Sequence, residues 1–286
     1  MQIIPALRGA LITATLSIAA LTASAGSVFV TGHDPIWHAS QGGNAAGATN
    51  LAQTGIDYAR NGSALPFLYI ESKTTGIPAG NLRTASFLTS ALGYGAGEFV
   101  VMDAANLAGL ADFRTALNSF SAIVVASDHG GMLGAAELAY LNGHVADIIS
   151  FLNAGGGLYA EAESNAAGLI GTEDPFGFLP FLVASTSFQA AETNNTVTVF
   201  GAGLGLVNAD VNGNFSHNFF SSTGGMSPVD LFNGDPNMPL TLAFRGQIDT
   251  GGVIPVPEPE TYALMLAGLG VLGMVARRRK LGSKTS

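Results

Sequence analysis

The fold is decided by one stretch of the chain, which runs from Ala122-Ile-Val-Val-Ala126 through segment 135–152 to Gly157-Leu-Tyr-Ala160. Its first and last parts are continuous apolar runs, which are typical of strands buried on both faces of a parallel sheet. The middle part predicts an amphipathic helix, Ala135–Leu152, because one stripe holds Leu138, Leu141, Val145, Ile148, Ile149 and Leu152. Asn153 and the glycines after it end this helix. A strand, a helix and a second strand in this order predict a βαβ unit with parallel strands.

Three further runs of the same kind precede this stretch, and helical patterns fill the gaps. The five predicted strands are Ser27–Thr31, Phe67–Ile70, Phe99–Met102, Ala122–Ala126 and Gly157–Ala160. The predicted helices are Asn44–Arg60, Leu82–Leu92, Leu107–Leu117 and Ala135–Leu152. Strands that alternate with helices predict an α/β fold with a doubly wound, mainly parallel sheet.

The pattern changes after Thr172, where Pro, Gly, Asn and Phe dominate. The segments Thr196–Phe200 and Leu240–Phe244 predict further strands, with no helix of comparable length between them. We interpret this part as a β-rich C-terminal extension that adds antiparallel edge strands to the same domain. The α/β domain is therefore expected to cover residues 26–250.

Residues 1–25 have the pattern of a secretory signal peptide. Arg8 precedes an apolar segment, Ala10–Leu21, and Ala23-Ser-Ala25 supplies the small residues of a cleavage site. The apolar segment is too short for a membrane span. The mature chain is therefore expected to begin near Gly26.

The other end of the chain combines a proline turn, an apolar run and a basic cluster. Pro257 and Pro259 disfavour helix in the residues before them, so 251–260 is expected to be an extended linker. The run Thr261–Ala276 carries no charge and would span about 24 Å as a helix, so 261–286 is interpreted as a transmembrane tail. The basic residues at its end, Arg277–Lys280, are expected to stay in the cytoplasm.

This tail resembles the PEP-CTERM sorting signal, which exosortase-type membrane proteases process in bacteria that export polysaccharide. The resemblance lies in the order of Pro257-Glu-Pro259, the span that begins Tyr262-Ala-Leu-Met-Leu, and the arginine cluster. It implies an exosortase-type protease as a partner, export through the inner membrane, a transient C-terminal anchor, and a final place at the cell surface or outside the cell. The sorting and processing residues that it implies are Pro257, Glu258, Pro259, Arg277, Arg278 and Arg279. The alternative is an ordinary C-terminal anchor, which needs no Pro-Glu-Pro turn.

Composition excludes several classes of function. The chain has no cysteine, so disulfides, thiolate metal ligands and cysteine nucleophiles are excluded. Without the two ends, residues 26–259 hold five cations against nineteen acids, a formal net charge of −14. Phosphate backbones repel such a body, which argues against nucleic acid as a partner and leaves cations or polysaccharide hydroxyls.

Acidic and histidine side chains follow the predicted strands at their carboxyl ends, where open α/β sheets bind ligands. These residues are His33, Asp34, His38, Glu71, Asp103, Asp128, His129, Glu161 and Glu163. We expect those after the first, fourth and fifth strands to share one cleft if these strands are neighbours. Three of them, His33, His38 and Asp128, are then candidate ligands of a divalent metal ion, and no other cofactor is expected. The alternative is that the acids cap the helices that follow, which we favour for Asp34 and Asp103.

Residues 27–170 also resemble the class I glutamine amidotransferase-like group, which has a flavodoxin-like fold. The resemblance lies in Val124-Val-Ala-Ser-Asp128-His129-Gly-Gly, the helix after it, and Phe151–Tyr159. In that family the next strand ends in a nucleophile elbow, which corresponds here to Ala162-Glu-Ser-Asn-Ala166 with serine in place of the usual cysteine. The catalytic candidates are Ser164 as nucleophile, His129 or His217 as its base, and Glu163 as the group that orients the base.

Two hypotheses about the α/β domain follow. In the first, which we prefer, it is a non-catalytic binding module of an exported surface or matrix-associated protein, with extracellular polysaccharide as a partner. In the second, it is an extracytoplasmic hydrolase of an ester, amide or glycan that uses Ser164 or a metal at the strand ends.

Overall fold

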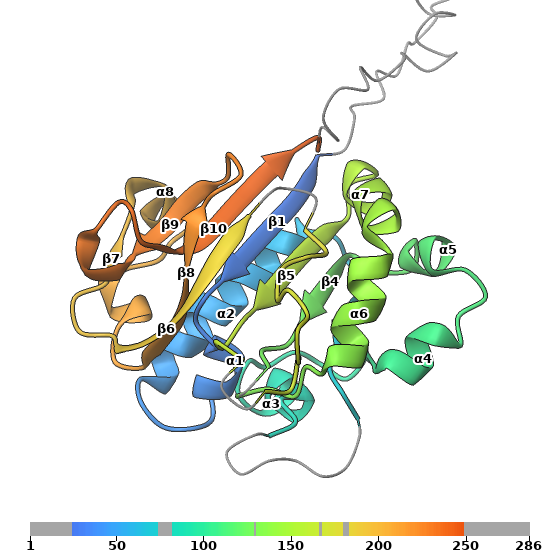
Figure 1. Ribbon diagram of the computed structural model, residues 1–286, viewed down its shortest axis with the longest axis horizontal. Coiled ribbons are helices and arrows are strands. Elements are labelled where there is room, and N and C mark those ends of the chain that lie inside the picture. Colours follow the sequence, from blue (N-terminus) through green and yellow to red (C-terminus); the bar gives the residue numbers. More distant parts are fainter. Residues whose placement is uncertain (1–24, 74–81, 129, 166–167, 180–182, 249–286) are drawn as a thin grey trace, which may run out of the picture.

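The computed structural model describes residues 25–73, 82–128, 130–165, 168–179 and 183–248, and its centre is an eight-stranded sheet (Figure 1). Five parallel strands come first, in the order β3 (Phe99–Met102), β2 (Phe67–Ile70), β4 (Ala122–Val125), β5 (Gly157–Glu161) and β1 (Gly26–Thr31). Three antiparallel strands follow, β10 (Pro239–Gly246), β9 (Ser227–Leu231) and β7 (Thr196–Val197). All five strands predicted for the parallel part are confirmed, with ends that differ by one residue at most.

Helices cover both faces of the sheet. Successive side chains of a strand point to opposite faces, and the central strands are apolar on both, so each face needs a layer of helices to bury it. Val28 and Val30 belong to the core that includes the apolar residues of α4–α7, whereas Phe29 belongs to the core beneath α2 and α3. The first set is α4 (Ala104–Ala108), α5 (Phe113–Leu117), α6 (Ala135–Gly143) and α7 (Val145–Asn153). The second set is α1 (Pro35–His38), α2 (Ala45–Arg60) and α3 (Ala85–Ser90). The expected three-layer α/β arrangement is therefore present.

Two predicted helices are each divided in two. The segment 107–117 forms the end of α4 and all of α5, because Asp112 begins a new helix by accepting a hydrogen bond from the Thr115 backbone N–H at 2.6 Å. The segment 135–152 breaks at His144, which has a non-helical backbone and follows Gly143, a weak helix former.

The C-terminal extension is built into the sheet. The strand predicted at 240–244 is confirmed as β10, but it lies against β1 over six residue pairs rather than at the edge. The strand predicted at 196–200 was wrong beyond Val197, because the Thr198 hydroxyl caps a short helix, α8 (Val199–Gly203). Two more strands, β6 (Ala184–Ala191) and β8 (Phe215–Ser222), form a separate sheet, and two 3₁₀ turns are η1 (Asn208–Val211) and η2 (Phe232–Gly234).

The order of the parallel strands differs from the flavodoxin-like order that the resemblance implied. A flavodoxin-like sheet places the first strand between the second and third. Here β1 lies between β5 and β10, because the extension supplies β1 with an antiparallel neighbour more than two hundred residues away in the sequence. The mainly parallel α/β sheet is thus confirmed, and the flavodoxin-like strand order is corrected.

The neighbouring ends of β1 and β5 create a natural place for a ligand. The chain that leaves β1 enters the core of α2 through Ile36, and the chain that leaves β5 enters the opposite core through Ala162 and Ile170. Where two adjacent parallel strands send their connections to opposite faces, a crevice forms beyond their carboxyl ends.

The processing segments predicted at the two ends of the chain fall almost wholly outside the described residues. The signal peptide predicted for 1–25 falls outside the described residues except for its last residue, and the linker and tail predicted for 251–286 lie wholly outside them. In the part of the chain that the structure describes, no helix has the length and apolar character needed to cross a membrane.

Candidate functional site

An acid and a histidine lie on the same side of α1, one at each end of this short helix. Asp34 precedes α1, and Pro35 begins it, a position that proline favours because its missing N–H needs no partner there. His38 lies one turn after Asp34, so the two side chains meet: Nε2 of His38 is 3.1 Å from Oδ1 of Asp34.

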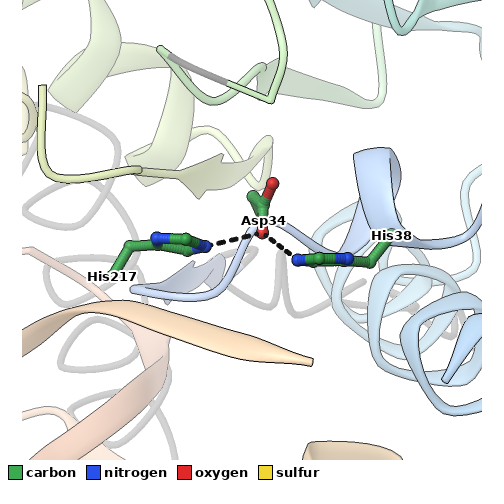
Figure 2. Close-up of side chains that lie close together, drawn as sticks. All are labelled: Asp34, His38 and His217. Carbon is green, nitrogen blue, oxygen red and sulfur yellow. Dashed lines mark ion pairs between the residues drawn. The ribbon is translucent and has the colours of Figure 1, made fainter. Parts of the chain in front are cut away.

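A second imidazole reaches the same oxygen from β8. The backbone N–H of His217 donates to the carbonyl of Gly32 at 2.8 Å, which fixes β8 against the end of β1. A Cβ at Gly32 would collide with the backbone of Asn218, so only glycine permits this approach. Nε2 of His217 then lies 3.1 Å from Oδ1 of Asp34, and Figure 2 shows the carboxylate between the two rings. We call Asp34, His38 and His217 the triad.

The triad is buried, and its members influence one another's ionisation. Burial by itself would raise the pKa of Asp34, but the imidazoles of His217 and His38 outweigh burial and lower this pKa to about 2. Burial by itself would lower the pKa of His38 and of His217, but the Asp34 carboxylate outweighs it and raises both above 6.5. The carboxylate of the triad is therefore ionised at any physiological pH.

The turn after β5 brings a second carboxylate to the triad. Oε1 of Glu163 lies 3.7 Å from Nε2 of His217, and its other carboxylate oxygen accepts a hydrogen bond from the Gly130 backbone N–H. The backbone N–H of Glu163 donates to Oδ1 of Asp128 at 2.6 Å. A Cβ at Gly130 would collide with the Asp34 carboxylate, which explains the glycine in this loop. The turns after β1, β4 and β5 thus meet at one place.

Glu161 lies beneath this site at the end of β5. Its Oε1 accepts hydrogen bonds from the Ile36 backbone N–H at 3.1 Å and from the Tyr159 hydroxyl at 2.6 Å, so it holds the start of α1 against β5. Burial raises the pKa of Glu161 well above its ordinary value of 4.5, and the nearby charge of Asp34 raises it further, although the Tyr159 hydroxyl acts in the opposite direction.

His33 belongs to a different group, which we call the lock: His33, Glu192 and Asp230. Nδ1 of His33 is 2.5 Å from Oε1 of Glu192, and Nε2 is 2.9 Å from Oδ2 of Asp230. Burial by itself would lower the pKa of His33, but the two carboxylates outweigh it and raise this pKa well above 6.5. The predicted metal ligands are therefore divided: His38 lies in the triad, His33 in the lock, and Asp128 beside Glu163.

The proposed nucleophile lies next to the triad. Ser164 has a φ of 49°, a left-handed conformation that is uncommon for residues with a side chain, and Asn165 follows with a φ of 52°. The backbone N–H of Ser164 donates to Oδ1 of Asn218 at 2.8 Å, directly after His217 in β8. His129, the other predicted base, lies outside the described residues.

A pocket of about 450 Å³ opens beside the triad. Its aromatic and amide walls are formed by Trp37, Gln41, Gln189, Asn214 and Phe215. Four glycines and three site residues complete the lining: Gly42, Gly43, Gly130, Gly213, His38, Glu163 and His217. Both histidines of the triad therefore border a space that a small ligand can enter.

Comparison with known proteins identifies the tail. Residues 255–280 match the PEP-CTERM protein-sorting motif. The PEP-CTERM motif marks this chain as an exported protein that an exosortase sorts by its C-terminal signal, as the sequence predicted. No curated protein matches the chain. The match covers the tail alone and says nothing of the α/β domain, whose candidate site is the triad and the pocket beside it.

Two members of the triad were not among the metal ligands predicted from sequence. Asp34 was interpreted as a helix cap, although the spacing Asp34-Pro-Ile-Trp-His38 places an acid and a histidine one helical turn apart. That spacing was a usable signal. His217 was predicted only as a possible base for Ser164, and no local signal joins it to Asp34, because β8 reaches the triad through its antiparallel pairing with distant parts of the chain.

Proposed function

We propose that this exported chain is a non-catalytic binding protein whose pocket takes a neutral, polyhydroxylated ligand, such as a segment of extracellular polysaccharide. The observation that carries the proposal is the lining of the pocket. Rings of Trp37 and Phe215 offer apolar surface, and the amides of Gln41 and Gln189 can both donate and accept hydrogen bonds, whereas the Asn214 amide is already paired with the backbone of Asn44. The hydroxyl groups of a sugar donate and accept hydrogen bonds, so they need both acceptors and donors in the pocket.

Charge and backbone shape support a neutral ligand. The described residues that line the pocket include no lysine or arginine, its two histidines are paired with the Asp34 carboxylate, and Glu163 adds a negative charge, so an anionic ligand meets no unpaired positive side chain there. Gly42, Gly43 and Gly213 have φ values of 73°, 61° and 97°, a left-handed backbone that glycine adopts without strain. At Gly42 the space that a side chain would take is open to a ligand, whereas Asn214 and Asn44 occupy it at Gly43 and Gly213.

Trp37 provides a direct test, because it is the only tryptophan of the chain and lines the pocket. The fluorescence of the full chain should change on titration with neutral glucose or mannose oligosaccharides and stay constant with polygalacturonate. Phe215→Ala should weaken binding about tenfold, equivalent to about 1.4 kcal/mol. Val199→Ala, at an exposed position outside the pocket, is the matched control. If no neutral oligosaccharide changes the fluorescence or gives calorimetric heat, the proposal is wrong.

A second candidate function is hydrolysis of an ester, amide or glycan. The left-handed backbone of Ser164, immediately after Glu163, favours it, because strained residues cluster at functional sites. p-Nitrophenyl acetate and p-nitrophenyl glycosides are suitable probes. Turnover that Ser164→Ala abolishes in a folded protein would establish the hydrolase and overturn the non-catalytic assignment.

The PEP-CTERM motif also predicts where the tail is processed. Pro257-Glu-Pro259 is an extended, charged turn before an apolar run, which a membrane protease can reach. Glu258→Ala should therefore leave a precursor with its tail intact, as mass spectrometry of the C-terminus would show. A product with the wild-type C-terminus and yield would contradict processing at this turn.

A further inference from the structure

We propose that the triad binds one divalent transition-metal ion, with zinc as the best chemical match, and that the ion faces the ligand pocket. Two imidazole nitrogens and one carboxylate oxygen are the donor set, from His38, His217 and Asp34. Imidazole donors suit zinc and its neighbours in the first transition row, whereas magnesium and calcium prefer oxygen ligands. The inference deepens the binding function proposed above, because both concern the same pocket.

The distances match a coordination site. Both Nε2 atoms lie 3.1 Å from the same Asp34 oxygen, and the three donor atoms lie within 4.8 Å of one another. Ligands about 2.0–2.1 Å from a tetrahedral zinc are about 3.4 Å apart, so an ion fits between these atoms with small movements.

The state of the polar atoms is a second, independent indication. Both oxygens of Asp34 and all four ring nitrogens of His38 and His217 are buried and have no hydrogen-bond partner among the described residues. Their 3.1 Å contacts lack the geometry of hydrogen bonds. Each buried polar atom left without a partner costs about 1–3 kcal/mol. Three of the six atoms, Oδ1 of Asp34 and the two Nε2 atoms, have only their mutual 3.1 Å ion-pair contacts, and one metal ion would satisfy all three at once.

The position of the triad defines the remaining coordination. Three protein ligands leave at least one position for water or a bound ligand, as in metal sites that act on other molecules. His38 and His217 both line the pocket, so this position faces the space beside Trp37 and Glu163. Hydroxyl groups of a neutral ligand could then bind the ion directly.

Metal titration of the full chain, without a polyhistidine tag, tests the proposal. We expect Zn²⁺ and Co²⁺ to bind with a stoichiometry of one by calorimetry, and Co²⁺ to quench Trp37, whose ring centroid is 4.8 Å from that of His38. Asp34→Asn and His217→Asn should each weaken binding more than about 100-fold, because even outer-shell changes cost about 10- to 100-fold. His144→Ala is the matched control, since this histidine stacks on Tyr140 outside the site.

The outcomes separate this proposal from the binding function. One ion per chain, lost in Asp34→Asn and His217→Asn while circular dichroism stays unchanged, supports the metal site whether or not any oligosaccharide binds. No binding tighter than about 1 mM, or binding that survives in both folded variants, overturns it. Loss of binding in His144→Ala alone would place the ion elsewhere and also overturn it.

Discussion

Two buried histidine groups contain neighbouring residues of the turn after β1, His33 in the lock and Asp34 in the triad, and their compositions are opposite. In the lock, one imidazole lies between two carboxylates, and both ring nitrogens of His33 have a hydrogen-bond partner. In the triad, one carboxylate lies between two imidazoles, and none of their buried polar atoms has a hydrogen-bond partner among the described residues. The same two side-chain types thus form a closed structural group in one case and an open donor set in the other.

Both groups join the β1–α1 turn to the C-terminal extension, so their location does not explain the difference. The lock connects His33 to Glu192, after β6, and to Asp230 in β9. The triad connects Asp34 to His217 in β8. What differs is the imidazoles: both ring nitrogens of His33 have a hydrogen-bond partner, although Oδ1 of Asp230 has none among the described residues, whereas no ring nitrogen of the triad has one there. The lock should therefore stabilise the fold through contacts that are already made, while the triad should gain further stability from a ligand.

The largest effect is expected when the lock is broken. His33→Ala leaves the carboxylates of Glu192 and Asp230 buried without their cation, and breaking a buried ion pair from one side costs about 3–5 kcal/mol. The melting temperature should fall by about 10 °C, since about 1 kcal/mol shifts it by about 2–4 °C in a domain of this size. Thermal and urea unfolding of the full chain would measure the loss.

His38→Ala is the matched control for this comparison. It removes one imidazole from the triad, but Asp34 keeps His217 at 3.1 Å. Without metal, the cost should be the ordinary about 1–2 kcal/mol of a buried substitution. Equal losses in the two variants would mean that both groups are structural, and the contrast between them would be wrong.

The second effect is the stabilisation of the protein by a bound metal ion, which should depend on the triad and not on the lock. At a zinc concentration of about 100 Kd, a single site stabilises the native state by about 2.7 kcal/mol. The melting temperature of the wild type should rise by about 5–10 °C and return to its former value with a chelator. His38→Ala should lose the shift. A shift of the same size in that variant would show that zinc stabilises the chain from outside the triad.

The sequence predicted the parallel part of the sheet because the necessary information is local. Each strand, such as Ala122–Val125, is a continuous apolar run between turns, and burial on both faces demands that composition. The pairing of β1 with β10 joins residues that are far apart in the sequence, such as Val28 and Phe244, and no local sequence pattern predicts it. The strand order and the position of the extension were therefore beyond sequence reasoning.

The candidate site, like the sheet, was predictable where the information is local and not where it depends on contacts between distant parts of the chain. That acids and histidines gather beyond the strand ends follows from the topology, and the structure brings Asp34, Asp128 and Glu163 to one place. Which histidine joins which acid depends on the direction of each side chain. His33 and His38 are five residues apart, yet they belong to different groups, because His33 lies in the turn between β1 and α1 whereas His38 lies in α1.

The smallest effect concerns Glu161, a buried carboxylate that contacts neither histidine group in the described structure yet lies beneath the triad. Burial raises the pKa of Glu161 in the folded state well above 4.5. Below pH 4.5 the side chain is protonated in both the folded and the unfolded state, so it imposes no penalty. As pH rises above 4.5, the unfolded state ionises first, and the folded state loses stability until its own pKa is reached.

Glu161→Gln should therefore stabilise the protein at pH 7 and leave its stability nearly unchanged at pH 4. The amide oxygen of glutamine can accept the same hydrogen bonds from the Ile36 N–H and the Tyr159 hydroxyl that Oε1 accepts now. Glu192→Gln gives the contrast, because it removes a negative charge beside His33 and should destabilise the protein at pH 7. Melting temperatures of the three proteins between pH 4 and pH 8 would test this. A Glu161→Gln variant that is less stable than the wild type at pH 7 would mean that this carboxylate, like those of the lock, is stabilised by a positive charge.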